Sequence, residues 1–292
     1  MRVMVQAPAK LNLTLDVTGR RPDGYHELCS IMQAVDRCDT LTAEPAQDIR
    51  LDTVGSAPCP PEQNIAYRAA ERFFAHTGIA GGVHMTLHKH IPQQAGMGGG
   101  SADGAAALLA LDALYGTALP PEQLYASGLS LGADVPFCLL GGTALAAGVG
   151  EKLTPLPALP DCVIAVAQPE QGVSTAEAYA RLDAAPVAGH PALSPALEAL
   201  QRGDLAGLCR QMGNVFEPAL ALPQVRAIRE QMAAFSPLCS QMTGSGSAVF
   251  ALFPPQAVAQ AERCVAALAQ CCPVAFLCRP CGAPVVSVEK TV

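Results

Sequence analysis

A glycine-dense stretch of the chain has the residue types that phosphate binding requires. Residues Pro92 to Gly104 read PQQAGMGGGSADG and run directly into AAALLALDALYG, which has the composition and apolar spacing of a helix. Glycines let successive backbone N–H groups approach an anion, and the first turn of a helix adds unpaired donors and the positive end of its dipole. Ser101 suits a helix cap or a contact to phosphate or its metal, and Asp103 suits the dipole. The stretch therefore predicts a phosphate-binding loop, with a flexible turn as the alternative.

This loop differs from the two most familiar nucleotide-binding motifs. No Lys follows the glycines, as the pattern G-x-x-x-x-G-K-[ST] requires. The stretch is also not a clean dinucleotide fingerprint, which would place an acidic residue about 20 positions further on. The differences disfavour an ordinary P-loop protein and a Rossmann domain.

Two charged residues and a second glycine turn add the other parts of a phosphoryl-transfer site. Lys10 lies on the first predicted strand, and Asp134 follows Gly132, which ends a predicted helix. Thr243 to Ser247 read TGSGS between two predicted strands, either as a tight connection or as a second backbone surface near a ligand. Alone, Lys10 could be a solvated lysine and Asp134 a helix N-cap. Together these features supply the anion site, the cation and the carboxylate that phosphoryl transfer needs.

The bulk composition limits the classes of function. The 292 residues suffice for one large domain or two of ordinary size. With 18 basic and 25 acidic residues the net charge is −7, and no basic run could follow a nucleic acid or an acidic membrane. The opening MRVMVQAPAK lacks the apolar core of a signal peptide, and the longest apolar run, Phe137 to Val149, is shorter than a membrane span. We therefore expect a cytoplasmic protein with no nucleic-acid or membrane partner.

Cysteines and histidines raise the alternative of a metal site. Four of the twelve cysteines lie near the C-terminus with the spacing CC-x5-C-x2-C, which is not a familiar zinc pattern. We expect free thiols, as in a reducing compartment. His84, His88 and His90 share one face of a predicted strand, but no carboxylate or cysteine accompanies them, so a metal site is disfavoured there as well.

Hydrophobic alternation predicts how the first half positions these residues. Leu11, Leu13 and Leu15 alternate with polar residues, which predicts a half-buried strand over Val3 to Thr18. Arg21-Pro-Asp-Gly24 is a turn signal. A returning strand at Tyr25 to Val35 would bring Lys10, Asn12, Tyr25 and His26 into one neighbourhood. Further strands are expected at Thr40 to Ala43, Ile49 to Val54 and Val83 to His90, and helices at Asn64 to His76, Ser101 to Tyr115 and from Pro121 to Leu131.

The amino-acid composition changes beyond Gly150, where the proline-rich segment TPLPALPD at Thr154 to Asp161 indicates an inter-domain linker. We therefore divide the chain into residues 1–155 and 156–292. The second part is expected to hold strands at Cys162 to Ala167, Cys239 to Met242, Ala248 to Phe253 and Val274 to Cys278, with helices at Ser174 to Asp183, Ser194 to Gln201, Asp204 to Met212, Pro223 to Phe235 and Pro255 to Gln270. Without its extra helices this order is β-α-β-β-α-β, a split-βαβ or ferredoxin-like layer.

Several segments together resemble the GHMP family of small-molecule kinases over nearly the whole chain. They are APAKLNLTLDVTGRRPDGYHEL at Ala7 to Leu28, AGMGGGSADGAAAL at Ala95 to Leu108, LGADVPFCLLGGTALAAGVGE at Leu131 to Glu151, VSTAEAYARLD at Val173 to Asp183, NVFE at Asn214 to Glu217, and MTGSGSAVFALF at Met242 to Phe253. The glycine loop is shared by galactose, mevalonate and homoserine kinases. The opening segment is similar only to the branch that acts on a cytidyl substrate in the non-mevalonate isoprenoid pathway.

The resemblance implies an α+β fold, with an N-terminal layer like ribosomal protein S5 domain 2, a C-terminal ferredoxin-like layer and the site in the cleft between them. It implies transfer of phosphate from ATP, with Mg²⁺, to the 2-hydroxyl of cytidine-diphosphate methylerythritol. Lys10 and Asp134 would be the catalytic pair. The nucleotide would contact Pro92, Gly96, Gly98, Gly99, Gly100, Ser101, Ala102, Asn64 and Lys89. The substrate would contact Asn12, Tyr25, His26, Thr175 and Gly246, with Tyr25 stacking on the cytosine and His26 bonding its polar edge.

Two positions depart from the family pattern, and other functions stay open. Gly104 stands where alanine is usual, and Gly246-Ser247 replaces a frequent glycine-proline pair; both concern local rigidity. The alternatives are a related kinase acting on homoserine or a sugar alcohol, a GHMP-like protein that holds nucleotide without turnover, and a structural interaction module. The sequence pattern assigns no oligomeric state and no carboxylate pair for Mg²⁺, and Ser101 is the candidate ligand of the ion.

Overall fold

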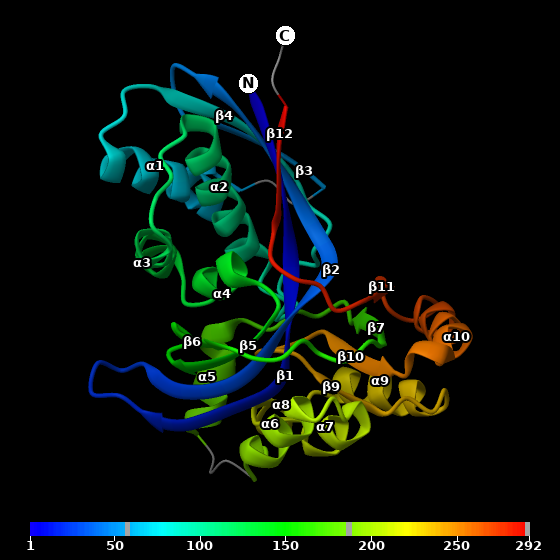
Figure 1. The fold of residues 1–292 in the computed structure, drawn as a ribbon. Coiled ribbons are helices and arrows are strands. Elements are labelled where there is room, and N and C mark those ends of the chain that lie inside the picture. Colours follow the sequence, from blue (N-terminus) through cyan, green and yellow to red (C-terminus); the bar gives the residue numbers. More distant parts are fainter. Residues whose placement is uncertain (56–58, 185–188, 290–292) are drawn as a thin grey trace.

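Two β-sheets with helices on their faces make up the molecule (Figure 1). The computed structural model of the chain describes residues 1–55, 59–184 and 189–289. The strands of the larger sheet are β1 (Arg2–Arg20), β2 (His26–Ala46), β3 (Arg50–Val54), β4 (Gly82–His88), β5 (Thr143–Gly148), β6 (Lys152–Pro155), β8 (Gly213–Asn214) and β12 (Val285–Glu289). The smaller sheet consists of β7 (Val163–Gln168), β9 (Cys239–Met242), β10 (Val249–Phe253) and β11 (Val274–Cys278). The mixed architecture confirms the predicted α+β class.

The helices follow the predicted pattern closely. In the first half they are α1 (Ile65–Thr77), α2 (Gly99–Tyr115), α3 (Pro121–Leu131) and α4 (Val135–Leu140). In the second half they are α5 (Thr175–Asp183), α6 (Leu193–Gln201), α7 (Leu205–Gln211), α8 (Phe216–Leu220), α9 (Pro223–Ala233) and α10 (Val258–Leu268). Short 3₁₀ turns lie at Pro61–Gln63 and Pro255–Ala257. None of the helices that the structure describes is long and apolar enough to cross a membrane.

The long hairpin of β1 and β2 links the two halves of the molecule (Figure 1). Two expectations are wrong here. The strands predicted at Tyr25 to Val35 and Thr40 to Ala43 are one continuous strand. β1 is buried on both faces from Ala7 to Leu15, whereas we expected half burial. The two extra residues on β2 between Val35 and Cys38 form a bulge, because Pro8 pairs with Cys38 and Ala9 with Val35. The bulge lets the strand continue through a polar stretch that resembles a turn in the sequence.

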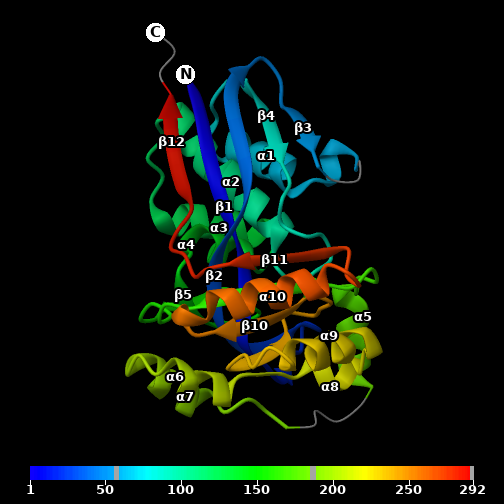
Figure 2. The ribbon, with the colours of Figure 1, turned by 90° about the vertical axis from the view of Figure 1, so that its right-hand side faces the viewer.

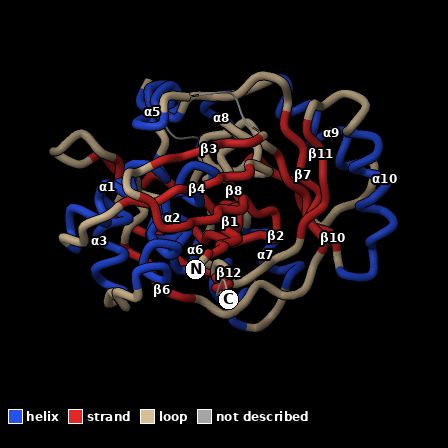
Figure 3. Tube along the Cα trace, turned by 90° about the horizontal axis from the view of Figure 1, so that it is seen from above, coloured by secondary structure: helices blue, strands red, loops and turns tan. Residues whose placement is uncertain are grey.

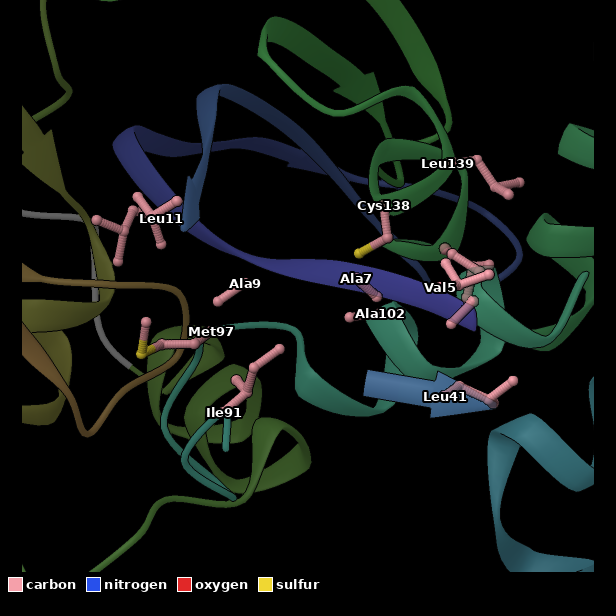
Figure 4. Packing of buried hydrophobic residues seen from close by; sticks show 14 of the residues in the cluster. Val5, Ala7, Ala9, Leu11, Leu41, Ile91, Met97, Ala102, Cys138 and Leu139 are labelled. Carbon is pink, nitrogen blue, oxygen red and sulfur yellow. The ribbon is translucent and has the colours of Figure 1, made fainter. Parts of the chain in front are cut away.

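Helix α2 lies at the centre of the first half, packed against α1, β1 and β2. Its buried face is rich in alanine, which lets the neighbouring elements approach closely. Figure 4 shows part of this core, with Ala9 of β1, Ile91 and Met97 of the connecting segment, and Ala102 of α2. Gly104 has a packing reason, because a Cβ at this position would come within 2.6 Å of Cγ2 of Ile65.

The smaller sheet confirms the predicted ferredoxin-like layer. Its strand order is β11-β7-β10-β9, and the chain order β7, helices, β9, β10, α10, β11 is β-α-β-β-α-β. Side chains of β7 alternate between two cores. Val163, Ala165 and Ala167 pack with α9 and α10, whereas Ile164 and Val166 join the core shared with the first half. Figures 2 and 3 show α9 and α10 on the outer face of this sheet. The sheet is therefore buried on both faces.

The chain returns to its own beginning after the smaller sheet. Strand β12, which we did not predict, pairs antiparallel with β1, so that Arg2 lies opposite Glu289 and Gln6 opposite Val285 (Figure 2). The predicted linker at Thr154 to Asp161 also begins inside strand β6. The last strand thus lies in the larger sheet, and the division at residues 155 and 156 stays a prediction.

Candidate active site

A cavity of about 1100 Å³ lies between elements of the two halves. It is lined by the β1–β2 hairpin, both glycine segments, the start of α2, the residue before α4, and α5. Every predicted site residue except Ala102 lines it: Lys10, Asn12, Tyr25, His26, Asn64, Lys89, Pro92, Gly96, Gly98, Gly99, Gly100, Ser101, Asp134, Thr175 and Gly246. Ala102 is fully buried behind the loop. The fold therefore brings together residues that are up to 236 positions apart in the sequence, from Lys10 to Gly246.

The glycine loop ends where α2 begins, with Gly98 as the N-cap at φ +72°. No side chain caps the helix, and the hydroxyl of Ser101 makes no hydrogen bond within the described part of the chain. The predicted capping role of Ser101 is therefore wrong, and its hydroxyl stays free to meet a ligand. The amide of Ala102 donates to the carbonyl of Gly98 at 2.8 Å, which leaves the preceding amides of the first turn as donors at the cavity.

The second glycine turn holds the first in place. The amide of Ala248 donates to the carbonyl of Ala95 at 3.2 Å, and a Cβ at Gly96 would collide with the carbonyl oxygen of Thr243. The hydroxyl of Thr243 also accepts from the amide of Asn12 at 3.0 Å. The turn at Thr243 to Ser247 thus joins β1 and the glycine loop, in addition to lining the cavity.

The side chain of Lys10 is buried and lines the cavity. Its Nζ is 2.7 Å from Oδ1 of Asn12 and 3.5 Å from Oδ2 of Asp134. Asn12 is fixed in turn, because its side-chain Nδ2 donates to the hydroxyl of Ser30 at 2.7 Å. Asp134 precedes α4 without capping it, and its side chain is 37% exposed at the cavity. The cation is therefore rigidly held and the carboxylate is accessible to a ligand.

Lys89 lies at the cavity edge but already has two carboxylate partners. Its ammonium pairs with Asp39, and also with Asp103 at 2.6 Å. Burial lowers the pKa of Lys89, but the two carboxylates outweigh this effect and raise it. Burial raises the pKa of Asp103 well above its ordinary value, against the opposing effect of Lys89. The expectation that Asp103 serves the helix dipole is thus incomplete, because this buried carboxylate is mainly the partner of a buried lysine.

Asp39 anchors the start of the glycine loop through the same cluster. Its Oδ1 accepts from the amides of His90 and Ile91 at 2.5 and 2.8 Å. The cluster therefore ties β2, the segment after β4 and α2 to one another directly beneath the loop. Oδ1 of Asp103 makes no hydrogen bond among the described residues, although it is buried.

The far end of the cavity is aromatic. Tyr25 is 64% exposed at the hairpin tip, as a side chain that stacks on a ligand would be. The ring of His26 stacks on Tyr179, with centroids 4.5 Å apart, and its Nε2 lies 2.7 Å from Oδ1 of Asp183. Thr175 shares a hydrogen bond of 3.2 Å with Ser245 of the second glycine turn. A flat ring could therefore lie between exposed and buried aromatic groups here.

Four of the residues in this arrangement were missed from the sequence. Tyr179 and Asp183 line the cavity, and a usable signal existed, since Thr175, Tyr179 and Asp183 recur every four residues on one face of α5. Arg20, in the hairpin, also lines the cavity. Asp39 lies within a strand and had no comparable signal.

The described part of the chain contains no cluster of side chains that would enclose a metal ion. Within residues 1–55, 59–184 and 189–289, no group of three or more His, Cys, Asp or Glu side chains could hold an ion. His84 instead pairs with Asp52 at 2.8 Å. All twelve cysteines are free thiols, as expected. Mg²⁺ bound to a nucleotide usually retains waters and uses few protein ligands, so the free hydroxyl of Ser101 in the cavity fits such an ion.

The chain is similar to known kinases in both sequence and fold. The family described as GHMP kinases N terminal domain matches residues 64–142, and that described as GHMP kinases C terminal matches residues 196–270. A crystal structure of 4-(cytidine 5'-diphospho)-2C-methyl-D-erythritol kinase matches with a TM-score of 0.80 and 38% identity, covering 96% of this chain and 100% of that one. A homoserine kinase from Cytophaga hutchinsonii matches in fold alone, with a TM-score of 0.75 and 20% identity, over 98% of this chain and 97% of that one. Fold and site together define a GHMP kinase, an ATP-using enzyme of small molecules.

Relatives in sequence show to which branch of the GHMP kinases the chain belongs. The 4-diphosphocytidyl-2-C-methyl-D-erythritol kinase of Carboxydothermus hydrogenoformans is 44% identical over 253 residues, covering 86% of this chain and 88% of the relative. That of Moorella thermoacetica is 45% identical over 251 residues, covering 84% and 87%. The chain belongs to the family of 4-diphosphocytidyl-2-C-methyl-D-erythritol kinases.

Proposed function

We propose that the chain transfers the γ-phosphoryl group of ATP to the 2-hydroxyl of 4-diphosphocytidyl-2-C-methyl-D-erythritol, a step in the non-mevalonate route to isoprenoid precursors. The observation that carries this proposal is the pair formed by Lys10 and Asp134, 3.5 Å apart beside the N-terminus of α2. The family membership names the substrate. A cytoplasmic location stays a prediction.

Asp134 would accept the proton of the attacking hydroxyl. The O–H bond of the substrate breaks, a new O–P bond forms, and the bond between the γ-phosphorus and the β–γ bridging oxygen breaks to release ADP. Because the transition state of phosphoryl transfer is loose, positioning and charge neutralisation contribute most of the rate. Lys10 would neutralise charge on the transferred group, and the amides at the start of α2 would hold the phosphates.

Mg²⁺ would accompany ATP. When bound, the ion neutralises charge on the phosphate oxygens, and the hydroxyl of Ser101 would be its protein ligand. We expect transfer to stop when Mg²⁺ is removed by a chelator and to return on its addition.

The direct test is incubation of the protein with ATP, Mg²⁺ and the cytidyl substrate, with the product identified by mass. A gain of one phosphoryl group is expected, with one ADP formed for each product molecule. Homoserine and galactose serve as alternative acceptors in parallel reactions. Phosphorylation of either one in preference to the cytidyl substrate, or binding of ATP with no transfer at all, would contradict the proposal.

A further inference from the structure

A carboxylate fixes the hydrogen-bonding state of the histidine at the aromatic end of the cavity. Nε2 of His26 lies 2.7 Å from Oδ1 of Asp183, and the imidazole stacks on Tyr179 at an interplanar angle of 23°. Tyr179 itself meets the edge of Phe216, with centroids 4.9 Å apart. The other oxygen of Asp183 pairs with Arg20 at 3.5 Å. The ring of His26 is therefore held both in its plane and in its rotation.

This arrangement determines which nitrogen of His26 carries the hydrogen. An ionised carboxylate only accepts hydrogen bonds, so Nε2 of His26 must be the donor to Asp183. In a neutral imidazole the second nitrogen, Nδ1, is then a bare acceptor. Within the described part of the chain Nδ1 has no hydrogen-bond partner, and it is not completely buried, although the His26 side chain is only 12% exposed. Because His26 lines the cavity, a ligand has an acceptor available there.

We propose that Asp183 is a positioning residue that holds His26 as a hydrogen-bond acceptor, so that the cavity selects a pyrimidine bearing an amino group over one bearing a carbonyl in its place. The inference rests on the proposed function, because it requires the cytidyl group to reach Tyr25 and His26. The amino group of cytosine donates to a bare nitrogen. Uracil presents a carbonyl oxygen at the same position, and two acceptors would face each other without a shared hydrogen.

Binding of two probes to the full chain tests this inference. Cytidine 5'-diphosphate and uridine 5'-diphosphate differ at the base edge, and a saturating non-hydrolysable ATP analogue blocks the nucleotide site during titration calorimetry. We expect the wild-type chain to bind the cytidine nucleotide about tenfold or more tightly than the uridine nucleotide, as one mismatched hydrogen bond predicts. In Asp183→Asn the amide can donate to Nε2, which moves the hydrogen to Nδ1. The preference should then fall about tenfold, partly through tighter uridine binding.

Matched variants separate this effect from a general loss of charge. Glu177→Gln removes one carboxylate from the same helix, but Glu177 pairs with Arg181 and does not line the cavity, so the preference should remain. Asp183→Glu keeps an acceptor and should also retain much of the preference. The ¹⁵N resonances of His26 give a reading that needs no ligand, because bare and hydrogen-bearing ring nitrogens are well separated. We expect a bare Nδ1 in the wild-type chain and a shift toward a bare Nε2 in Asp183→Asn.

Two outcomes would overturn the inference. One is a folded Asp183→Asn protein in which the ¹⁵N resonances place the hydrogen on Nδ1 and which still keeps the wild-type preference for the cytidine nucleotide. The other is a bare Nε2 in the wild-type chain. Both leave the proposed function standing. A wild-type chain that binds neither nucleotide while the ATP site is blocked would instead contradict the proposed function, and the inference with it.

Discussion

Lys10 and Lys89 are two buried lysines at one cavity, and they differ in how far their charge is balanced by protein carboxylates. Lys10 has a neutral partner in Asn12 and a carboxylate partner, Asp134, which is partly exposed. Lys89 lies between two carboxylates that are almost completely buried. The charge of Lys10 is thus available to a ligand, whereas that of Lys89 is already balanced. The sequence predicted both lysines at the site, but their partners came from other elements, and Asp39 in particular had no distinguishing pattern.

Removing either member of the proposed catalytic pair should abolish transfer without unfolding the chain. Asp134→Asn loses the proton acceptor, and Lys10→Met loses the cation. We expect turnover to fall about a thousandfold or more in each variant. Single-turnover assays measure transfer, and calorimetric titration with the ATP analogue measures nucleotide affinity. The ATP affinity of Asp134→Asn should stay within about threefold of wild type. Near-normal turnover by either variant would remove it from the mechanism.

Lys89→Met should destabilise the fold, because it leaves two buried carboxylates without a cation. The expected loss is about 3–5 kcal/mol near neutral pH. Burial raises the pKa of Asp103, and a carboxyl whose pKa is higher in the folded state contributes stability at low pH that is lost as the pH rises. The deficit in the free energy of unfolding should therefore shrink from about pH 8 to about pH 5, as Asp103 binds a proton. Urea unfolding of the wild-type and Lys89→Met chains at both pH values measures this loss of stability.

Lys152→Met is the matched control, since Lys152 is exposed on β6. It should change the stability by less than about 0.5 kcal/mol at either pH. A deficit of Lys89→Met that stays constant over this range would contradict the account of the buried cluster.

At the scale of elements, the site depends on contacts between segments that the sequence shows only as separate signals. The glycine loop and the helix after it were predicted, since composition and periodicity are local properties. The contact of Gly96 with the turn at Thr243 was not predictable, because it depends on how the two sheets meet. The bulge of β2 at Asp36 was not predictable for the same reason. The backbone amide of Arg279 donates to the Asp36 carboxylate at 2.7 Å and holds the bulge. Periodicity alone placed a break there.

Gly98 offers a test of how closely the loop approaches Lys10. Its φ is +72°, and a Cβ there would lie 2.9 Å from Cγ of Lys10. Gly98→Ala should lower turnover at least about tenfold by displacing the ammonium. Gly116→Ala is the matched control, since Gly116 has φ +61° and nothing lies within 4 Å of its added Cβ. Both variants should lose about 1 kcal/mol of stability from backbone strain, but only Gly98→Ala should lose activity. Equal activities in the two variants would contradict this contact.

At the scale of the whole molecule, the two predicted parts of the chain share one hydrophobic core and one sheet. One hydrophobic core joins α1 to α4 with a face of the smaller sheet, and β12 crosses back to the larger one. The fold class was predictable, because the order of strands and helices is local information. The crossing was not, because residues 285–289 form a short exposed strand with no partner visible in the sequence. Its partner, β1, lies at the other end of the chain.

Deletion of residues 285–292 should lower stability and solubility together. It removes the strand that pairs with β1 over Arg2 to Gln6 and leaves that edge of the sheet open. We expect a loss of a few kcal/mol and association that increases with concentration. Thermal unfolding and light scattering measure the two effects. Val285→Thr keeps a β-branched residue at an exposed position and should behave as wild type. A truncated chain that is monomeric and fully stable would show that β12 is dispensable.

The pairing of β12 with β1 also bears on how the protein is made. A ribosome that adds about 5–20 residues per second releases Arg2 on the order of tens of seconds before Glu289. During synthesis the backbone groups of β1 that face β12 have no native partner, and polysomes hold several nascent copies close together. Translation speed and chaperone occupancy should therefore affect the yield of this enzyme more than its stability after completion does.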